Sequence, residues 1–425
     1  MVRVGMWINS QDLLRDGVDP LFSKLGSYGF DSASLFVGAG KLIFEPDKTL
    51  YGTMAPVHDP GLKGKDLLRE ACRGADDHGI GLTATAVCFP DEYHAQSFPQ
   101  YAAQDVSGAR HENFLCPNRA EVRDYLRNLM QDMCARYEVD AIELDYVRYK
   151  RNREGSELPV LLLAGKYCYC EACRAKAEAS GLDWKEVISS ARLASEAAEK
   201  VDLDEFRKIG ELYRNALDIV RFYVMYPALA KWLRFRVDTI SSFVAEIKDE
   251  LKSAGRTIEL SADLFYPTLS WIVGQDYEQL SGHLDSAKPM IYSAAMGGWE
   301  TGYLRSLYKG LGGGSEGELI EFLDNVQGFS SGASSFAELE VEGAHDQYVL
   351  HETRKARLLL GDRTRLYTGL SSGWVPGVRF STPVRVKYDI DSAVKAGSDG
   401  LWFFSYGSTS EEIFETIKNS VAALR

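Results

Sequence analysis

Residues 140–149 alternate apolar and polar side chains and then end in a group of charged and aromatic residues. This pattern predicts a buried strand that runs outward into a cavity. Because side chains alternate across a strand, Glu143 and Asp145 share one face, and the opposite face is apolar. Buried carboxylates are costly unless they are paired or face a wet cavity. The pattern therefore indicates either a functional site or a structural ion pair with an arginine such as Arg148.

Short apolar segments with the pattern of strands recur along the chain, and segments with helical spacing separate them. The predicted strands are 2–9, 31–38, 81–89, 140–149, 258–266, 288–294, 365–371 and 400–406, and the predicted helices are 20–28, 64–78, 121–137, 228–252, 319–326, 347–360, 384–396 and 410–424. Strands joined by helical crossovers form parallel sheets, so this order predicts an α/β protein with a closed (β/α)8 TIM barrel. A doubly wound open sheet is the alternative, but no Gly-x-Gly-x-x-Gly follows the first strand.

The regular alternation is interrupted after the fourth strand. Residues 150–227 contain closely spaced cysteines and then helical sequence, and the fourth barrel helix begins near Ala228. We therefore expect residues 1–425 to form a single catalytic barrel with a helical, cysteine-containing insertion at 150–227. The segment 90–117 is a long connection rich in aromatic residues and histidine, which favours a lid. The glycine-rich region 297–317 is expected to be a loop after the sixth strand.

The charge of the chain narrows the classes of partner. Lys plus Arg total 48 against 61 Asp plus Glu, a net charge of −13, which argues against general affinity for nucleic acid or for an anionic membrane. No apolar run is long enough to cross a bilayer. The first residues lead directly into a strand without the regions of a signal peptide, so we expect a cytoplasmic location. This charge balance favours a small ligand that is either neutral or has its charge paired locally.

Polar and aromatic residues gather at the predicted carboxyl ends of the strands, where barrel enzymes carry their functional groups. These residues are Trp7 and Asn9 on the first strand, Asp145 on the fourth, Asp263 on the fifth, Tyr292 on the sixth, Ser371 on the seventh and Tyr406 on the eighth. Two carboxyl groups on neighbouring strands suit glycoside hydrolysis, in which one stabilises or attacks an oxocarbenium-like centre and the other protonates the leaving oxygen. The distance between them, which would separate retention from inversion, does not follow from the sequence.

Aromatic rings stack on the C–H faces of sugars, and several tryptophans lie near strand ends or in the loops that follow. They are Trp7, Trp271, Trp299, Trp374 and Trp402. The alternative for each is a core position, since large aromatic side chains are highly buried on average. Arg148, three residues after Asp145, is a further candidate substrate contact.

Several motifs together resemble glycosyl-hydrolase-like barrel families related to the α-amylase superfamily. The motifs lie at Asn113–Tyr125, Val139–Tyr149, Leu260–Phe265, Gly274–Gln275, Pro289–Tyr292 and Ser398–Trp402, and they span most of the barrel. By this resemblance Asp145 takes the position of the fourth-strand nucleophile. Amylases carry a glutamate as the fifth-strand acid, whereas this chain has Asp263, so Glu143 or Glu300 are alternative acids. His111 and His345 are candidate substrate contacts, against the plain alternative of solvated loop histidines.

Three cysteines lie close together in the run Cys168-x-Cys170-x-x-Cys173. The chain has seven cysteines in all, and this odd number does not suggest a disulfide framework. Three thiolates could hold a structural zinc ion with a fourth ligand from elsewhere, such as Cys116 or a histidine. Without a matching second pair the signature is incomplete, so the sequence favours reduced or locally bonded thiols, and no catalytic cofactor is expected.

These observations favour a glycoside hydrolase that acts on an oligosaccharide or glycoside. A sugar-binding barrel without catalytic activity is the second hypothesis. A metal-assisted hydrolase or lyase is the third, and it is disfavoured because the sequence has neither His-x-His nor His-Glu-x-x-His. The oligomeric state stays open.

Overall fold

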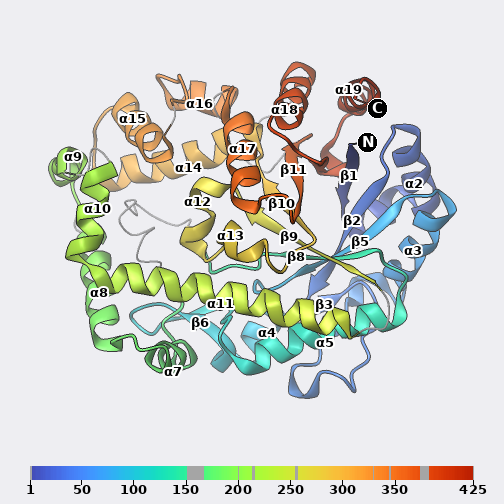
Figure 1. Cartoon of the computed structure of the whole chain (residues 1–425), viewed down its shortest axis with the longest axis horizontal. Helices are drawn as coiled ribbons and strands as arrows, with labels where there is room; N and C mark the ends of the chain where they lie inside the picture. The colour runs from blue at the N-terminus through green and yellow to red at the C-terminus, as the bar shows by residue number, and fades with distance from the viewer. Residues whose placement is uncertain are drawn as a thin grey trace.

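The computed structural model describes residues 2–150, 167–199, 201–212, 216–253, 257–328, 330–343, 346–373 and 382–424. Within these ranges a parallel sheet closes on itself in the order β1-β12-β11-β10-β9-β8-β5-β2, with β2 pairing again with β1 (Figure 1). The barrel strands are β1 (Arg3–Ile8), β2 (Ser32–Ala39), β5 (Gly81–Val87), β8 (Ala141–Asp145), β9 (Glu259–Phe265), β10 (Ser286–Met290), β11 (Arg365–Ser371) and β12 (Gly400–Phe404). The predicted (β/α)8 barrel is confirmed.

Helices follow the strands as a parallel barrel requires. They are α1 (Ser10–Asp16), α2 (Val18–Ser27), α3 (Leu67–Asp77), α5 (Ala120–Arg136), α11 (Pro227–Lys252), α17 (Tyr348–Leu360), α18 (Pro383–Lys395) and α19 (Glu411–Ala422), with the short α12 (Pro267–Ser270) and α13 (Tyr277–Leu280) between β9 and β10. Ile142 and Leu144 on β8 are fully buried on the face opposite Glu143. The alternation expected from the sequence therefore holds for this strand.

The loop after β5 carries structure of its own. It contains α4 (Glu92–Ser97) and a two-stranded antiparallel hairpin of β6 (Ala102–Gln104) and β7 (Arg110–Leu115). The connection after β2 holds the short strands β3 (Lys41–Leu42) and β4 (Val57–His58). Short 3-10 turns accompany these connections at Gly52–Met54, Pro60–Leu62, Pro99–Tyr101, Trp271–Val273 and Tyr406–Ser408. The connections after β2 and β5 thus contain short helices and strands of their own.

A helical lobe extends from one side of the barrel, at the left of Figure 1. It combines α7 (Glu171–Ala179), α8 (Trp184–Glu199), α9 (Leu203–Leu212) and α10 (Ala216–Met225) with α14 (Ser293–Leu311), α15 (Glu316–Gln327) and α16 (Phe336–Glu342). Phe206 of α9 packs with Leu304, Leu319 and Leu339 in a core separate from that of the barrel. The expectation of a loop at 297–317 is wrong, because this packing stabilises α14 and α15 despite their glycines.

No helix in the described part of the chain is both long enough and apolar enough to cross a membrane.

Candidate active site

The barrel centre holds a buried ion pair between Glu143 of β8 and Lys288 of β10. The other carboxylate oxygen of Glu143 accepts from Trp7 Nε1 at 2.9 Å and from Thr85 Oγ1 at 2.9 Å. Glu143 has no exposed surface. Because donors reach both of its oxygens, this carboxylate is compensated as a buried charge must be. The structural ion pair foreseen for this strand is thus present, with a lysine as the partner in place of Arg148.

Lys288 is the cation of this ion pair, which forms the floor of the site, and its side chain is 1% exposed. Its ammonium group donates to Ser34 Oγ at 3.0 Å and lies 4.1 Å from the centre of the Trp402 ring. Trp402 Nε1 donates to the same Ser34 hydroxyl at 3.0 Å. Burial lowers the pKa of Lys288, and the adjacent Glu143 carboxylate is the group that favours its charged form. Trp402 therefore takes the core alternative and not a sugar-stacking position.

Asp145 is the last residue of β8, one layer above this floor. The register of β8 with β9 runs to Leu144 opposite Ala262, so the next position on the two strands brings together Asp145 and Asp263. Adjacent strands lie about 4.8 Å apart. The two carboxyl groups therefore start from neighbouring backbone positions at the same height of the barrel.

The chain turns sharply directly after Asp145. Tyr146 adopts a left-handed conformation with φ 52°, which is uncommon for a bulky residue and is typical of functional sites. The turn directs the backbone N–H of Tyr146 to Asp145 Oδ1 at 2.7 Å. The guanidinium of Arg148 lies over the rings of Tyr146 and Phe265, at 4.3 Å and 4.2 Å. The carboxylate of Asp145 thus has one hydrogen-bond donor and one cation beside it.

The surroundings set different pKa values for the two carboxyl groups. Burial raises the pKa of Asp145 to about 6, while Arg148 and the Tyr146 N–H oppose that rise. Burial also raises the pKa of Asp263 well above its usual range, and the negative charge of Asp145 raises it further. Asp145 and Asp263 are 6% and 2% exposed. Asp263 is therefore the member of the pair that holds its proton more tightly, and Asp145 is the member that ionises more readily.

Aromatic rings surround the carboxyl groups. Tyr292 stacks on Phe404 with ring centres 5.3 Å apart, and its edge contacts Trp7 at 6.2 Å and the half-buried Trp299 at 6.3 Å. Burial raises the pKa of Tyr292, and the charges of Asp263 and Asp145 raise it further. The structure thus joins Trp7, Tyr292 and Trp299 to the site.

Asn9 and Tyr406 were predicted as substrate contacts, and the structure gives them other partners. The side chain of Asn9 caps α1 and accepts from the backbone N–H groups of Gln11 and Asp12. The Tyr406 ring packs on Phe414 of α19 at 5.8 Å and lies near Lys24 of α2. The strand pattern had been extended past Phe404, where β12 ends, so the inferred face of Tyr406 was wrong.

Glu300 and His111 lie on elements that the sequence did not predict. Glu300 is buried in α14, near Tyr348 of α17, so its placement in a loop was wrong. His111 lies on β7, where its ring nitrogen contacts Lys150 and its edge meets Tyr167 at 5.2 Å. Two further predicted contacts, Trp374 and His345, lie outside the described residues.

Sequence reasoning missed Lys288, which is central to the floor of the site. The predicted sixth strand began at this residue, two positions late, so the lysine looked like a strand end. A charged residue inside an otherwise apolar strand was the available signal, because such a residue must have a buried partner. That partner is Glu143.

A closed parallel barrel with two buried carboxyl groups at adjacent strand ends, lined by aromatic rings, has the architecture of a glycoside hydrolase. The profile of the family described as "Putative glycosyl hydrolase domain" matches residues 61–306. The chain belongs to this family. No match to the chain was found among curated proteins.

Solved structures with the same fold are glycoside-acting proteins of several kinds. Alpha-L-fucosidase isoenzyme 2 from Paenibacillus thiaminolyticus superposes with a TM-score of 0.57 and 13% identity, covering 100% of this chain and 49% of the fucosidase chain. The PgaB (BpsB) glycoside hydrolase domain from Bordetella bronchiseptica gives 0.58 and 9%, covering 99% and 98%. The catalytic domain of beta-amylase from Paenibacillus polymyxa gives 0.56 and 12%, covering 99% and 98%. Identities this low show the shared barrel fold alone.

Proposed function

We propose that the chain hydrolyses glycosidic bonds with Asp145 and Asp263 as the paired carboxyl groups. The observation that carries the proposal is that two buried carboxyl groups lie at adjacent strand ends, with the pKa of Asp145 raised to about 6 and that of Asp263 raised well above its usual range. Glycoside hydrolysis requires one ionised and one protonated carboxyl group on either side of the scissile bond.

The two aspartates have different roles in this mechanism. The carboxylate of Asp145 attacks or stabilises the anomeric carbon as positive charge develops there. The carboxylic acid of Asp263 donates its proton to the departing glycosidic oxygen. Arg148 keeps Asp145 ionised through its positive charge. Glu143 is a positioning residue that holds Trp7 and Lys288 beneath the reacting groups.

We infer a retaining reaction from the strand geometry. Carboxyl groups about 5–5.5 Å apart serve retaining enzymes, whereas inverting enzymes need about 6.5–9.5 Å to admit a water molecule. Residues at equivalent heights of adjacent strands begin about 4.8 Å apart, which favours the shorter separation. Asp145 then forms a covalent glycosyl ester, and the conjugate base of Asp263 removes a proton from the water that cleaves it. The same arrangement supports the α-amylase-related placement of Asp145 as a fourth-strand nucleophile.

The substrate side of the proposal is a neutral sugar. The half-buried Trp299 presents a ring of the kind that stacks on sugar C–H faces, and the buried rings of Tyr292 and Trp7 support it from within the barrel. Ser261 Oγ, Asp263 Oδ1 and Ser371 Oγ are buried polar atoms that have no hydrogen-bond partner among the described residues. Such atoms are costly unless a ligand or water pairs with them, and sugar hydroxyl groups can do so.

The experiment incubates the full chain with a panel of 4-nitrophenyl glycosides and, separately, with polysaccharides assayed for new reducing ends. We expect release from at least one member of the panel by the wild-type chain and loss of that release in Asp145→Asn. Tight glycan binding in calorimetry without any product over long incubation would contradict the proposal and favour a sugar-binding barrel.

A further inference from the structure

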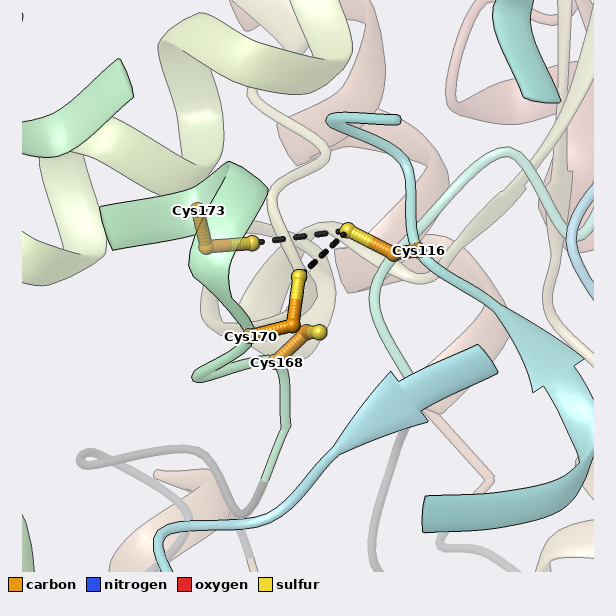
Figure 2. A group of neighbouring side chains, drawn as sticks. All are labelled: Cys116, Cys168, Cys170 and Cys173. Atoms are coloured by element: carbon orange, nitrogen blue, oxygen red, sulfur yellow. Dashed lines mark hydrogen bonds between the residues drawn. The ribbon is translucent and has the colours of Figure 1, made fainter. Parts of the chain in front are cut away.

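Four cysteines from two distant parts of the chain converge at one point beside the barrel. The Sγ atoms of Cys116, Cys168, Cys170 and Cys173 all lie within 4.8 Å of one another, and all four side chains are buried. In Figure 2 the cysteines surround a common centre. Three of these cysteines are close together in the sequence. The fourth, Cys116, precedes them by helix α5 and strand β8, and the fold brings it beside them.

Rigid elements hold the four cysteines in place. Cys116 follows β7 directly and precedes α5, while Cys173 lies in the first turn of α7. Cys168 and Cys170 lie in the segment that leads into α7, and this segment is fixed to the hairpin by the Tyr169 N–H bond to Gln104 O at 2.8 Å. The arrangement therefore joins the hairpin after β5 to the insertion after β8.

The sulfur separations fit a mononuclear metal site and not a disulfide. The Sγ atoms of Cys116 and Cys173 are 3.5 Å apart, and those of Cys116 and Cys170 are 3.4 Å apart. A disulfide needs about 2.05 Å. Zinc bound tetrahedrally with Zn–S bonds of about 2.3 Å places its sulfurs about 3.8 Å apart. The observed separations are close to the edge of that tetrahedron.

N–H donors point at three of the four sulfurs. The backbone N–H of Gln104 donates to Cys168 Sγ at 3.2 Å, and that of Asn118 donates to Cys116 Sγ at 3.4 Å. The Asn118 side chain donates to Cys173 Sγ at 3.3 Å. Donors of this kind favour the thiolate form and orient metal ligands from outside the coordination sphere.

A buried arginine supplies positive charge beside the cysteines. Four thiolates around Zn²⁺ carry a net charge of −2, which is costly to bury without compensation. Arg236 of α11 is 1% exposed and lies 4.5 Å over the ring of Tyr149. Its Nε and Nη1 atoms have no hydrogen-bond partner within the described ranges. An anionic metal centre accounts for a cation buried at this place.

We propose that Cys116, Cys168, Cys170 and Cys173 bind one structural Zn²⁺ ion. Four protons leave the thiols as the four Zn–S bonds form. The site also reaches the loop that follows Asp145, because the Asn118 side chain that donates to Cys173 also donates to the Tyr149 hydroxyl at 3.0 Å. Zinc thus ties the insertion to the loop after β8. This site replaces the reduced thiols that the sequence favoured, and it does not depend on the hydrolytic mechanism.

The test measures metal in the full, tag-free chain by plasma mass spectrometry, without added chelator. We expect about one zinc per chain in the wild type and in Cys72→Ser, whose half-buried thiol lies on α3 outside the site. Cys170→Ser and Cys173→Ser each lose a ligand and should lose most of that zinc. Unchanged zinc in both variants would overturn the assignment of the site.

A second measurement covers variants that fail to fold. X-ray absorption at the zinc edge of the wild-type chain should show four sulfur neighbours at about 2.3 Å. A shell of nitrogen and oxygen, or a stoichiometric amount of iron in place of zinc, would overturn the proposal. So would a thiol titration in denaturant that finds fewer than the seven cysteines of the sequence, because disulfides would then account for the missing thiols.

Discussion

Burial raises the pKa of Asp263, and the negative charge of Asp145, its neighbour across the adjacent parallel strands β8 and β9, raises it further. Each group alone would be an expensive buried acid. Together they form a pair in which one member can lose its proton because the other keeps it, which is the protonation pattern that a general acid and a nucleophile need.

The pH dependence of kcat/KM should be bell-shaped. Asp145 must be ionised, and its pKa is raised to about 6, so activity should fall about tenfold per pH unit below that value. Asp263 must hold its proton, and its pKa is raised well above the usual range, so activity should fall again at higher pH. Initial rates across the pH range check this. A plateau extending down to pH 4 would contradict the assignment of Asp145.

Replacing Arg148 should move the acidic limb of that profile. The positive charge of Arg148 lowers the pKa of Asp145, so Arg148→Gln should shift the limb to higher pH and reduce activity at pH 6 several-fold. The matched control is Arg234→Gln on α11, whose partner Asp238 is also exposed. An unchanged limb in Arg148→Gln would mean that Asp145 does not control it.

The role of Asp263 predicts a dependence on the leaving group. Asp263→Asn removes the proton donor, so kcat for a poor leaving group should fall by about 10²–10⁴. The dinitrophenolate of a dinitrophenyl glycoside leaves without protonation, so the rate of the first step with that substrate should fall far less. Parallel assays with the two leaving groups decide the matter, since equal losses for both would assign Asp263 to a role other than proton donation.

The acidic face of β8 and the neighbouring acid on β9 could be predicted from the sequence, for a physical reason. A strand alternates strictly, so Glu143 and Asp145 could be assigned to one face, and the same argument gave Asp263. The alternation fails where a strand ends, which explains the error at Tyr406. It also needs the correct strand start, which explains why Lys288 was missed.

The pattern of apolar and polar residues does not predict contacts between segments that lie far apart in the chain. Cys116 follows the hairpin and Cys170 lies in the insertion, and the structure shows that their sulfur atoms are in contact. The packing of Phe206 against Leu304 likewise stabilises helices whose glycines argue against them locally.

The buried pair of Glu143 and Lys288 should be strongly coupled in stability. Lys288→Met leaves the Glu143 carboxylate buried without its cation and should lower the free energy of unfolding by about 3–5 kcal/mol. Adding Glu143→Gln should restore part of that loss, which denaturant titration measures. Arg305→Met, at an exposed ion pair with Glu340, serves as the control and should cost less than about 1 kcal/mol. Independent, additive losses in the double variant would contradict the coupling.

Asp145→Asn should stabilise the chain at neutral pH. A pKa raised from 3.8 to about 6 means that this carboxyl group favours the folded state below its unfolded pKa, and that the benefit is lost as pH rises through 6. At pH 7 the variant avoids a cost of up to about 3 kcal/mol, and near pH 4 the difference should shrink. Thermal unfolding at the two pH values tests the sign. Equal effects at both would indicate that Asp145 is not a strained, buried acid.

The most direct test of the account compares kcat/KM of Asp145→Asn with that of Asp124→Asn, on whichever glycoside the wild-type chain cleaves. Asp124 is an exposed residue of α5 paired with Arg127, so its variant controls for the substitution itself. Loss of the nucleophile should reduce kcat/KM by about 10³ or more, with the fold unchanged by circular dichroism, while the control stays within about twofold. Turnover in Asp145→Asn within tenfold of the wild type would contradict the central claim.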